Sequence, residues 1–516
     1  MADLSSVPFE IHSIILDFCD FRATRSYSLV AKATTSAAQR HLYRELHLGP
    51  AGHVTQWTCT TIQHLLRTLV RRPDLVAVVK SVHLDVHYAC NFTEEARYLE
   101  KVGVERADSD LTSLARAVVE DLDLPNSCSW DIKLRHTSLD PWIAVLLARL
   151  TSMESLRLGP ALLHRATFLG SILGAADAGY KVAGLNYGPE IYMPFFNHPS
   201  LEDFEMSLGQ FPKLRQWRIK QAPSSLTAFR LLRTGGINQQ QVADSLALMP
   251  KLEALHLGWN EVSGPSGTLT AHPPIDFAEI KAALDPLSQH LKALSIGVTH
   301  YRPKSGQLDA EDDPTRPFIE WADSSLGSLA SLGFLEHLEV SVNILLDFVP
   351  WIDTLEDVLP KSLRSLVLTD ETLTWRQGIL EDLLQPWEHG LHQVVALLGR
   401  YLLLHEIFAP HLTSVTLNFT AAIGSDGSVP QALERRLRGC AEASHVTVKI
   451  LYVQAYPLEH STRLYPIALT IYNRQTPKVA PMIRCGGPLT RVPLYWFPRS
   501  WSRSEYAYRF PMQKLS

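Results

Sequence analysis

Apolar residues recur along most of this chain in one short pattern, with a leucine or another large apolar residue at positions i, i+3 and i+5. Residues 226–231 read Leu-Thr-Ala-Phe-Arg-Leu, and residues 252–257 read Leu-Glu-Ala-Leu-His-Leu. Between these segments, Val242 and Leu246 stand at helical spacing, and Pro250 ends the run because proline cannot continue a helix. The pattern therefore predicts a strand, a helix and a second strand.

A strand and a helix that are each apolar on one face cannot bury those faces alone, so such units must stack on copies of themselves. We therefore expect an α/β fold, an irregular leucine-rich-repeat solenoid with a parallel sheet on its concave side and helices on its convex side. Further strand patterns begin at Leu46, Val79, Met153, Leu201, Leu214, Leu291, Leu335, Leu363, Leu412 and Val446. Their irregular spacing indicates inserted loops, and the stretches 258–274 and 301–317 have the Pro, Gly and Ser content of such loops.

Side chains alternate between the two faces of a strand, so the residue at i+4 points away from the residues at i+3 and i+5. In a stacked array these i+4 residues line the concave face: His83, Arg157, Arg218, His256, Ser295, Glu339, Val367 and Thr416. The predicted target-binding residues are Arg157, Arg218, His256 and Glu339. A mixed set of charges suits recognition of one protein surface, although a merely solvated face would carry the same mixture.

The first part of the chain has a purely helical pattern. Pro8 stands where the first turn of a helix tolerates a missing N–H. An apolar stripe follows at i, i+3, i+4, i+7 and i+8, and consists of Ile11, Ile14, Ile15, Phe18 and Cys19. Two more short helices are indicated, around Tyr27 and around Leu42. Three short helices hold little core, so we expect them to dock on a partner or to cap the open end of the array.

This segment resembles the F-box, the module that docks on the Skp-type adaptor of cullin–RING ubiquitin ligases. The matching positions are Val7, Pro8, Glu10, Ile11, Ile15, Leu16, Leu29, Val30, Lys32, Leu42, Tyr43 and Arg44. The resemblance implies that the adaptor binds Pro8, Ile11, Ile15, Leu16, Leu29, Val30 and Leu42. The chain departs from the family at 23–25, where Ala-Thr-Arg replaces an Asp-Leu-Leu step, and at Thr34, where an aromatic residue is usual. Residues 71–84 are similar to a passage found early in fungal F-box proteins with degenerate leucine-rich repeats.

We therefore divide the chain into an F-box-like helical module at 1–48, a degenerate repeat array at 49–450 and a C-terminal segment at 451–516. The final stretch, 484–516, carries six basic residues and a single acid, Glu505, among seven aromatic residues. Basic and aromatic residues together can bind single-stranded nucleic acid. Such a segment can also cover the exposed core of the last repeat, and we favour the cover because the whole chain is mildly acidic.

The composition narrows the class of protein. Of 516 residues, 46% are apolar and 20% are charged, which is typical of a globular protein. The net charge, 48 − 53 = −5, does not favour nucleic acid or an acidic membrane as a partner. The six cysteines form no CxxC pair, which favours a reducing compartment, the cytoplasm or the nucleus. The sequence also shows no secretory signal and no apolar run of the ~20 residues needed to cross a bilayer.

The sequence contains no phosphate-binding loop, zinc-protease motif or serine-hydrolase elbow. His83, Asp85 and His87 would share one strand face, but neighbouring ligands would lie ~7 Å apart along the strand, too far to share one ion. We therefore expect no metal, no cofactor and no enzymatic activity.

Together these observations favour a substrate-recognition subunit. Its F-box would dock the Skp-type adaptor, and through it a cullin, while the array or its loops hold an unidentified target protein. The alternative is a leucine-rich-repeat scaffold whose F-box has decayed, which the Ala-Thr-Arg departure at 23–25 favours.

Overall fold

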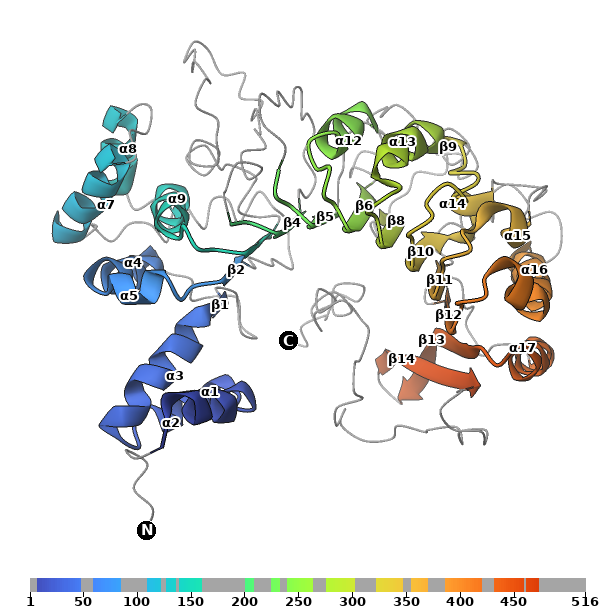
Figure 1. The fold of residues 1–516 in the computed structure, drawn as a ribbon, viewed down its shortest axis with the longest axis horizontal. Coiled ribbons are helices and arrows are strands. Elements are labelled where there is room, and N and C mark those ends of the chain that lie inside the picture. Colours follow the sequence, from blue (N-terminus) through green and yellow to red (C-terminus); the bar gives the residue numbers. More distant parts are fainter. Residues whose placement is uncertain are drawn as a thin grey trace.

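In the part of the chain that the structure describes, eleven parallel strands run side by side in one curved sheet, and a twelfth strand pairs with the last of them in the antiparallel sense (Figure 1). In sheet order the strands are β1 (Glu45–His47), β2 (Ser81–Leu84), β3 (Ser155–Leu158), β4 (Asp203–Ser207), β5 (Ala228–Leu232), β6 (Ala254–Val262), β8 (Ala293–Tyr301), β10 (His337–Ser341), β11 (Ser365–Thr369), β12 (Ser414–Phe419), β13 (Thr447–Leu458) and β14 (Ser461–Tyr472). A separate pair consists of β7 (Ile275–Asp276) and β9 (Ala322–Ser324). The predicted α/β class with a parallel sheet is confirmed.

This computed structural model describes residues 7–47, 59–84, 109–121, 127–135, 139–159, 200–207, 224–232, 239–262, 275–301, 322–346, 354–369, 386–419, 431–458 and 461–472. Within these ranges every predicted strand pattern falls in a strand of the sheet. The pattern at Leu214, with Arg218, lies outside the described residues, and β4 pairs directly with β5.

Helices follow most of the strands and lie along the outside of the curved sheet, as Figure 1 shows. The helices of this body are α4 (Cys59–Arg71), α5 (Pro73–Val76), α7 (Ser109–Asp121), α8 (Ser127–Arg135), α9 (Leu139–Arg149), α12 (Gln239–Leu246), α13 (Phe277–Leu284), η3 (Asp285–Leu287), α14 (Val342–Leu346), α15 (Leu355–Val358), α16 (Pro386–Phe408) and α17 (Gln431–Ser444). The core lies between the sheet and these helices.

The strands are in register, so their apolar residues form continuous rows. The i+3 and i+5 positions face the helices and are almost fully buried, as at Leu156, Phe204, Phe229, Leu255, Leu294, Leu338, Leu366 and Val415. They belong to the same core as helix residues such as Leu66, Val242, Ile280 and Leu398. This continuous burial is what the repeated leucine pattern requires, because each unit covers the apolar face of the next.

A chain of backbone hydrogen bonds fixes the level at which successive strands begin. In each unit, the residue just before the strand donates a backbone N–H to the carbonyl oxygen of the corresponding residue in the preceding unit. Lys80 N donates to Arg44 O (2.9 Å), and Glu154 N donates to Lys80 O (2.8 Å). The series continues as far as Thr413 N, which donates to Arg364 O (2.9 Å). Ion pairs add to this edge, including Lys80 Nζ with Glu154 at 2.6 Å. The amino-terminal edge of the sheet is therefore level.

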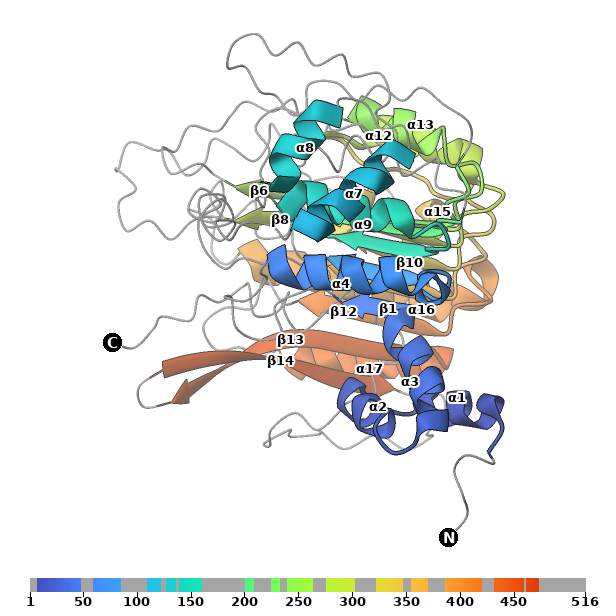
Figure 2. The same cartoon turned by 90° about the vertical axis from the view of Figure 1, so that its left-hand side faces the viewer.

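Three helices stand apart at the start of the chain: α1 (Phe9–Asp17), α2 (Phe21–Tyr27) and α3 (Lys32–Arg44). They form the N-terminal helical module, residues 7–44, which lies at one end of the curved body (Figures 1 and 2). Helices α1 and α2 both pack on α3. Helix α3 ends at Arg44 and β1 begins at Glu45, so no linker separates the module from the sheet.

Three predicted boundaries differ from the ends of the strands in the structure. The insertion predicted at 258–274 starts too early, because β6 continues to Val262, and the one predicted at 301–317 begins after Tyr301, the last residue of β8. The C-terminal boundary at 451 falls inside β13. The rest of both insertions, and the basic and aromatic stretch 484–516, lie outside the described residues. In the described part of the chain, no helix combines the length and the apolar character needed to cross a membrane.

Candidate protein-binding sites

The N-terminal module exposes a cluster of large apolar side chains. Phe18 is 87% exposed and Leu29 is 82% exposed, which is unusual for residues of this size. We define the apolar face as the exposed residues Phe9, Ile11, Ile14, Ile15, Phe18, Leu29 and Val30. They come from α1, from the residue that follows it and from the turn after α2. Ile11, Ile14, Ile15 and Phe18 share one stripe by their helical spacing, and exposed apolar surface of this kind is typical of a site that another protein covers.

Most of the residues that the F-box resemblance implies for adaptor binding lie on or beside this face. Pro8, Ile11, Ile15, Leu29 and Val30 are exposed, and Leu42 is half-buried. Leu16 is a correction: its side chain is fully buried against Ala37 and Ala38, so it supports the module and cannot touch a partner. The predicted adaptor set also omitted Phe9, Ile14 and Phe18, although the helical stripe already contained the last two.

Contacts between the helices orient the apolar face. His12 Nδ1 lies 2.7 Å from the hydroxyl of Tyr27, which ties α1 to α2. The guanidinium of Arg40 lies 5.4 Å from the ring centroid of Phe9, which ties α1 to α3 by a cation–π contact. The inward side of α1 therefore uses His12 and Leu16, and its isoleucines are left on the outside.

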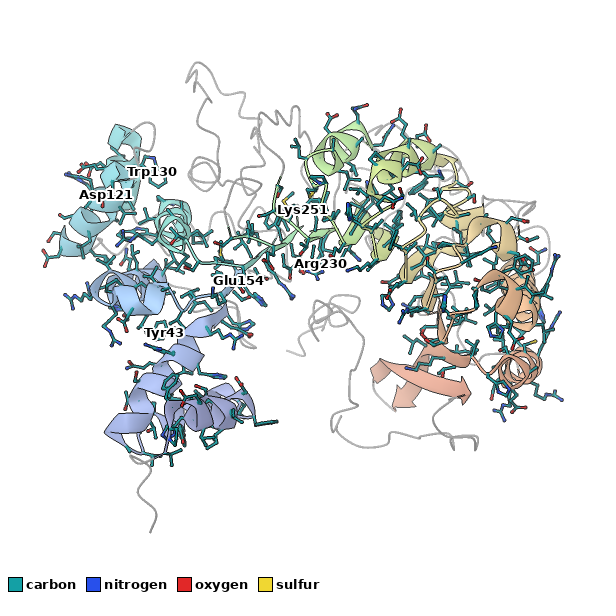
Figure 3. All side chains as sticks on the ribbon, viewed as in Figure 1. Tyr43, Asp121, Trp130, Glu154, Arg230 and Lys251 are labelled. Carbon is teal, nitrogen blue, oxygen red and sulfur yellow. The ribbon has the colours of Figure 1, made fainter. Side chains whose placement is uncertain are left out.

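The junction between the module and the sheet body is packed. Tyr43, labelled in Figure 3, packs against the main core from the last turn of α3. Arg72 donates to Gln39 of α3 (Nη1 to Oε1, 3.4 Å) and makes two 2.8 Å hydrogen bonds to the carboxylate of Asp74. These hydrogen bonds lower the pKa of Asp74 below its usual value. These contacts hold α3 in place relative to the sheet body.

A second candidate site is the concave face of the sheet. We define its central row by the in-register residues His47, His83, Arg157, Glu205, Arg230, His256, Ser295, Glu339, Val367, Thr416 and Lys449. Three of the four predicted target-binding residues, Arg157, His256 and Glu339, lie in this row. Arg218 lies outside the described residues. The row extends across all eleven parallel strands, so the concave surface is organised as one line of side chains.

The prediction missed Glu205 and Arg230, which occupy the centre of the row. Both are i+4 residues of strand patterns that the sequence displays, those beginning at Leu201 and Leu226. The alternation rule that selected Arg157 and His256 would therefore have found them. Figure 3 shows Arg230 on the inner side of the curved sheet.

Neighbouring strands pair the charges of β3 to β5. Arg157 Nε lies 3.5 Å from Glu205 Oε2, and both side chains are less than one-fifth exposed. Arg230 makes an ion pair with Asp203, to which Ser155 Oγ also donates at 3.3 Å. Because these charges are already paired, a ligand at this position would have to compete with an existing network.

The environment of His256 keeps its ring neutral. Burial in the sheet lowers the pKa of His256 to about 4, and the positive charge of Arg230 adds to the effect. His256 therefore provides an uncharged hydrogen-bonding group beside a charged network at physiological pH.

The far half of the concave face carries shorter side chains. Ser295 Oγ donates to Glu339 Oε2 at 3.0 Å, and Ser414 Oγ donates to Ser365 Oγ at 3.2 Å. Thr416 follows in the central row. Short hydroxyl side chains leave the sheet accessible to a large partner and offer it hydrogen bonds.

No group of three or more His, Cys, Asp or Glu residues in the described ranges is arranged to hold a metal ion. His83 contacts His47 across β1 and β2, with ring centroids 4.3 Å apart. Asp85 and His87, the other two residues of the sequence motif, lie outside the described residues. The described surface thus offers apolar and polar groups for binding another molecule.

No family model and no curated protein matches this sequence.

Proposed function

We propose that the protein is the substrate-recognition subunit of a cullin–RING ubiquitin ligase of the SCF type. The N-terminal module acts as an F-box and docks the Skp-type adaptor. The curved body acts as a degenerate leucine-rich-repeat solenoid that holds the target protein. The subunit transfers nothing itself, and it promotes ubiquitination by raising the effective concentration of the target near the ligase.

The observation that carries this proposal is the exposed apolar face. A module that only capped the end of the array would turn its apolar stripe inward, because an exposed cap needs a polar outer surface. Here Ile11, Ile14 and Ile15 are exposed, and among the described residues Phe18 is the most exposed large apolar side chain. Covering these side chains with a partner would be favourable at about 25 cal/mol per Å² of apolar surface. The position of the face in an F-box-like sequence favours the Skp-type adaptor as that partner.

Target binding is proposed for the central row of the concave face. The row combines paired charges at Arg157 and Glu205 with the neutral His256 and the hydroxyls of Ser295 and Thr416. Such a mixture supports specificity, since a partner must match both the charges and the hydrogen-bonding groups.

The second candidate function is that of a scaffold that no longer binds the adaptor. It is favoured by Thr24 and Arg25, which stand where the family has apolar residues: Thr24 is buried in the module and Arg25 is exposed at its surface. The scaffold hypothesis predicts that changes on the apolar face have no effect on any partner.

The experiment compares two doubly substituted full-length proteins. Ile11→Asp/Leu29→Asp places two charges on the apolar face, whereas Leu403→Asp/Ile407→Asp places the same charges on exposed apolar residues of α16. Affinity for a recombinant fungal Skp-type adaptor is measured by calorimetry, and captured proteins are identified by mass spectrometry. We expect the first variant to bind the adaptor at least about tenfold more weakly and the control to bind normally, with target capture kept in both. Equal adaptor binding by both variants, or none by the wild type, would refute the proposal.

A further inference from the structure

Among the side chains that the structure describes, the N-terminal module buries few large apolar residues in a core of its own. Its buried apolar cluster contains Leu16, Ala37 and Ala38, with Tyr27 partly buried beside them, and it is separate from the main core of the sheet body. Among the described side chains, the module exposes more large apolar residues on the apolar face than it buries in this cluster. The hydrophobic contribution to folding is therefore weak in this part of the chain.

The interior of the module also contains polar atoms that have no hydrogen-bond partner. His12 and Thr24 are buried, with 2% and 1% of their surface exposed. His12 Nε2 and Thr24 Oγ1 both lack a partner in the structure. A buried polar atom without a partner destabilises the folded state, because it has lost its hydrogen bond to water.

The intrinsic stability of α1 and α2 cannot compensate for the small core and the unpartnered polar atoms. Helix α1 has nine residues and α2 has seven, and isolated helices of this length are not stable in water. Helix α3 is different, since Tyr43 packs on the main core and the chain continues directly into β1. The weakly held part is therefore α1, α2 and the turn after α2, residues 9–30.

We infer that residues 9–30 are a conditionally folded unit whose order depends on occupancy by the adaptor. In the free chain this unit opens and closes while the sheet body stays folded. Docking of the adaptor buries the apolar face, supplies the missing apolar contacts and holds the unit closed. The inference rests on the proposed function and adds a form of regulation to it: a subunit without its adaptor presents an accessible apolar segment, and an assembled subunit does not.

Hydrogen exchange measured by mass spectrometry on the full-length chain tests the unit without any partner. We expect amides of residues 9–30 to exchange at least about 100-fold faster than those of β10, β11 and β12. Addition of saturating recombinant Skp-type adaptor is expected to slow exchange in residues 9–30 by at least about tenfold and to leave the three strands unchanged. Exchange of residues 9–30 as slow as that of the strands in the free chain would overturn the inference, as would adaptor binding that does not slow it.

A core substitution separates folding of the module from contact with the partner. Thr24→Val keeps the side-chain shape and removes the unpartnered hydroxyl at a position that is too buried to touch a partner. If the binding-competent state is only partly populated, stabilising it must tighten binding. We expect Thr24→Val to slow exchange of residues 9–30 in the free chain and to lower the Kd for the adaptor by about threefold or more.

The matched control is Thr68→Val on α4, where the hydroxyl donates to His64 O at 2.9 Å. It is expected to leave the adaptor Kd unchanged. Slower exchange in Thr24→Val without tighter binding would overturn the inference. Failure of the wild type to bind the adaptor at all would refute the proposed function, whereas the exchange rates of the free chain would still decide whether residues 9–30 open independently.

Discussion

Arg230 on β5 and His256 on β6 occupy paired positions on the concave face, and the guanidinium helps to keep the imidazole neutral. The pKa of His256 is lowered from 6.5 to about 4 in the folded protein. Between these values the unfolded chain binds a proton that the folded chain does not, so acidification favours unfolding. The loss of stability begins as the pH falls below about 6.5 and is complete near pH 4, and it amounts to about 3 kcal/mol at most.

His256→Gln removes this pH dependence. Denaturant unfolding of both proteins at pH 7.5 and at pH 4.5 is expected to show that the variant loses about 2 kcal/mol less than the wild type on acidification. His290→Gln, at an exposed histidine before β8, controls for the replacement itself. An equal loss in wild type and His256→Gln would contradict the assigned role of His256.

Truncation of two adjacent residues of one strand should destabilise the protein to very different extents. Leu368 of β11 is buried against the helices, whereas Val367 lies in the central row on the concave face. We expect Leu368→Ala to lower the free energy of unfolding by about 2–5 kcal/mol, and Val367→Ala to lower it by less than about 1 kcal/mol. Comparable losses in chemical denaturation would mean that the faces of β11 are misassigned.

Gly399 provides a test of packing between α16 and α17. A Cβ atom at this position would lie 3.2 Å from the sulfur of Cys440, closer than normal contact. Gly to Ala within a helix normally stabilises by about 1 kcal/mol, but the strain here offsets that gain, so we expect Gly399→Ala to be neutral or destabilising by about 1 kcal/mol. Gly439→Ala is the control on α17, because nothing lies within 4 Å of its Cβ, and it should stabilise the protein by about 1 kcal/mol.

The stability of both glycine variants is measured by thermal unfolding. A combined Gly399→Ala/Cys440→Ala protein should recover the helical gain, since the second change removes the sulfur. Stabilisation by Gly399→Ala alone would show that α17 moves away freely.

Under the proposed function, the direct connection between Arg44 and Glu45 leads to a prediction about ubiquitin transfer. Insertion of Gly-Ser-Gly-Ser between these residues separates the module from the sheet body without changing either binding surface. We expect unchanged affinity for adaptor and target, but ubiquitin transfer to the target that is slower by about tenfold, because rigid positioning is lost. The same insertion after Ser266, in a predicted loop, is the control, and equal transfer rates in a reconstituted ligase would contradict the prediction.

The sequence was sufficient for the sheet because one rule applies to each strand. The leucine pattern marks both the strand and its buried face, as Leu255, Leu257 and His256 illustrate. The helical module was harder to predict. A stripe of five apolar residues identifies an amphipathic helix but does not say whether the chain or a partner covers it, and the buried side of α1 is made by His12 and Leu16.

The ion pairs between neighbouring strands could not be predicted from the sequence pattern either. The ion pair of Arg157 with Glu205 joins residues that are separated by a long segment of the chain. It depends on which strand lies beside β3, and the periodicity of apolar residues contains no information on that choice. The same is true of the pair between Arg230 and Asp203.

The level amino-terminal edge of the sheet has a consequence for how such a molecule can change. The carbonyl of Arg44 accepts the first of a line of backbone hydrogen bonds that sets where each new strand starts, while β6 and β8 run on past their neighbours at the opposite edge. Extra residues can therefore accumulate on the carboxyl side without shifting any strand against the next. The amino-terminal edge keeps the strands in register, and the carboxyl edge can accept insertions of different length and sequence.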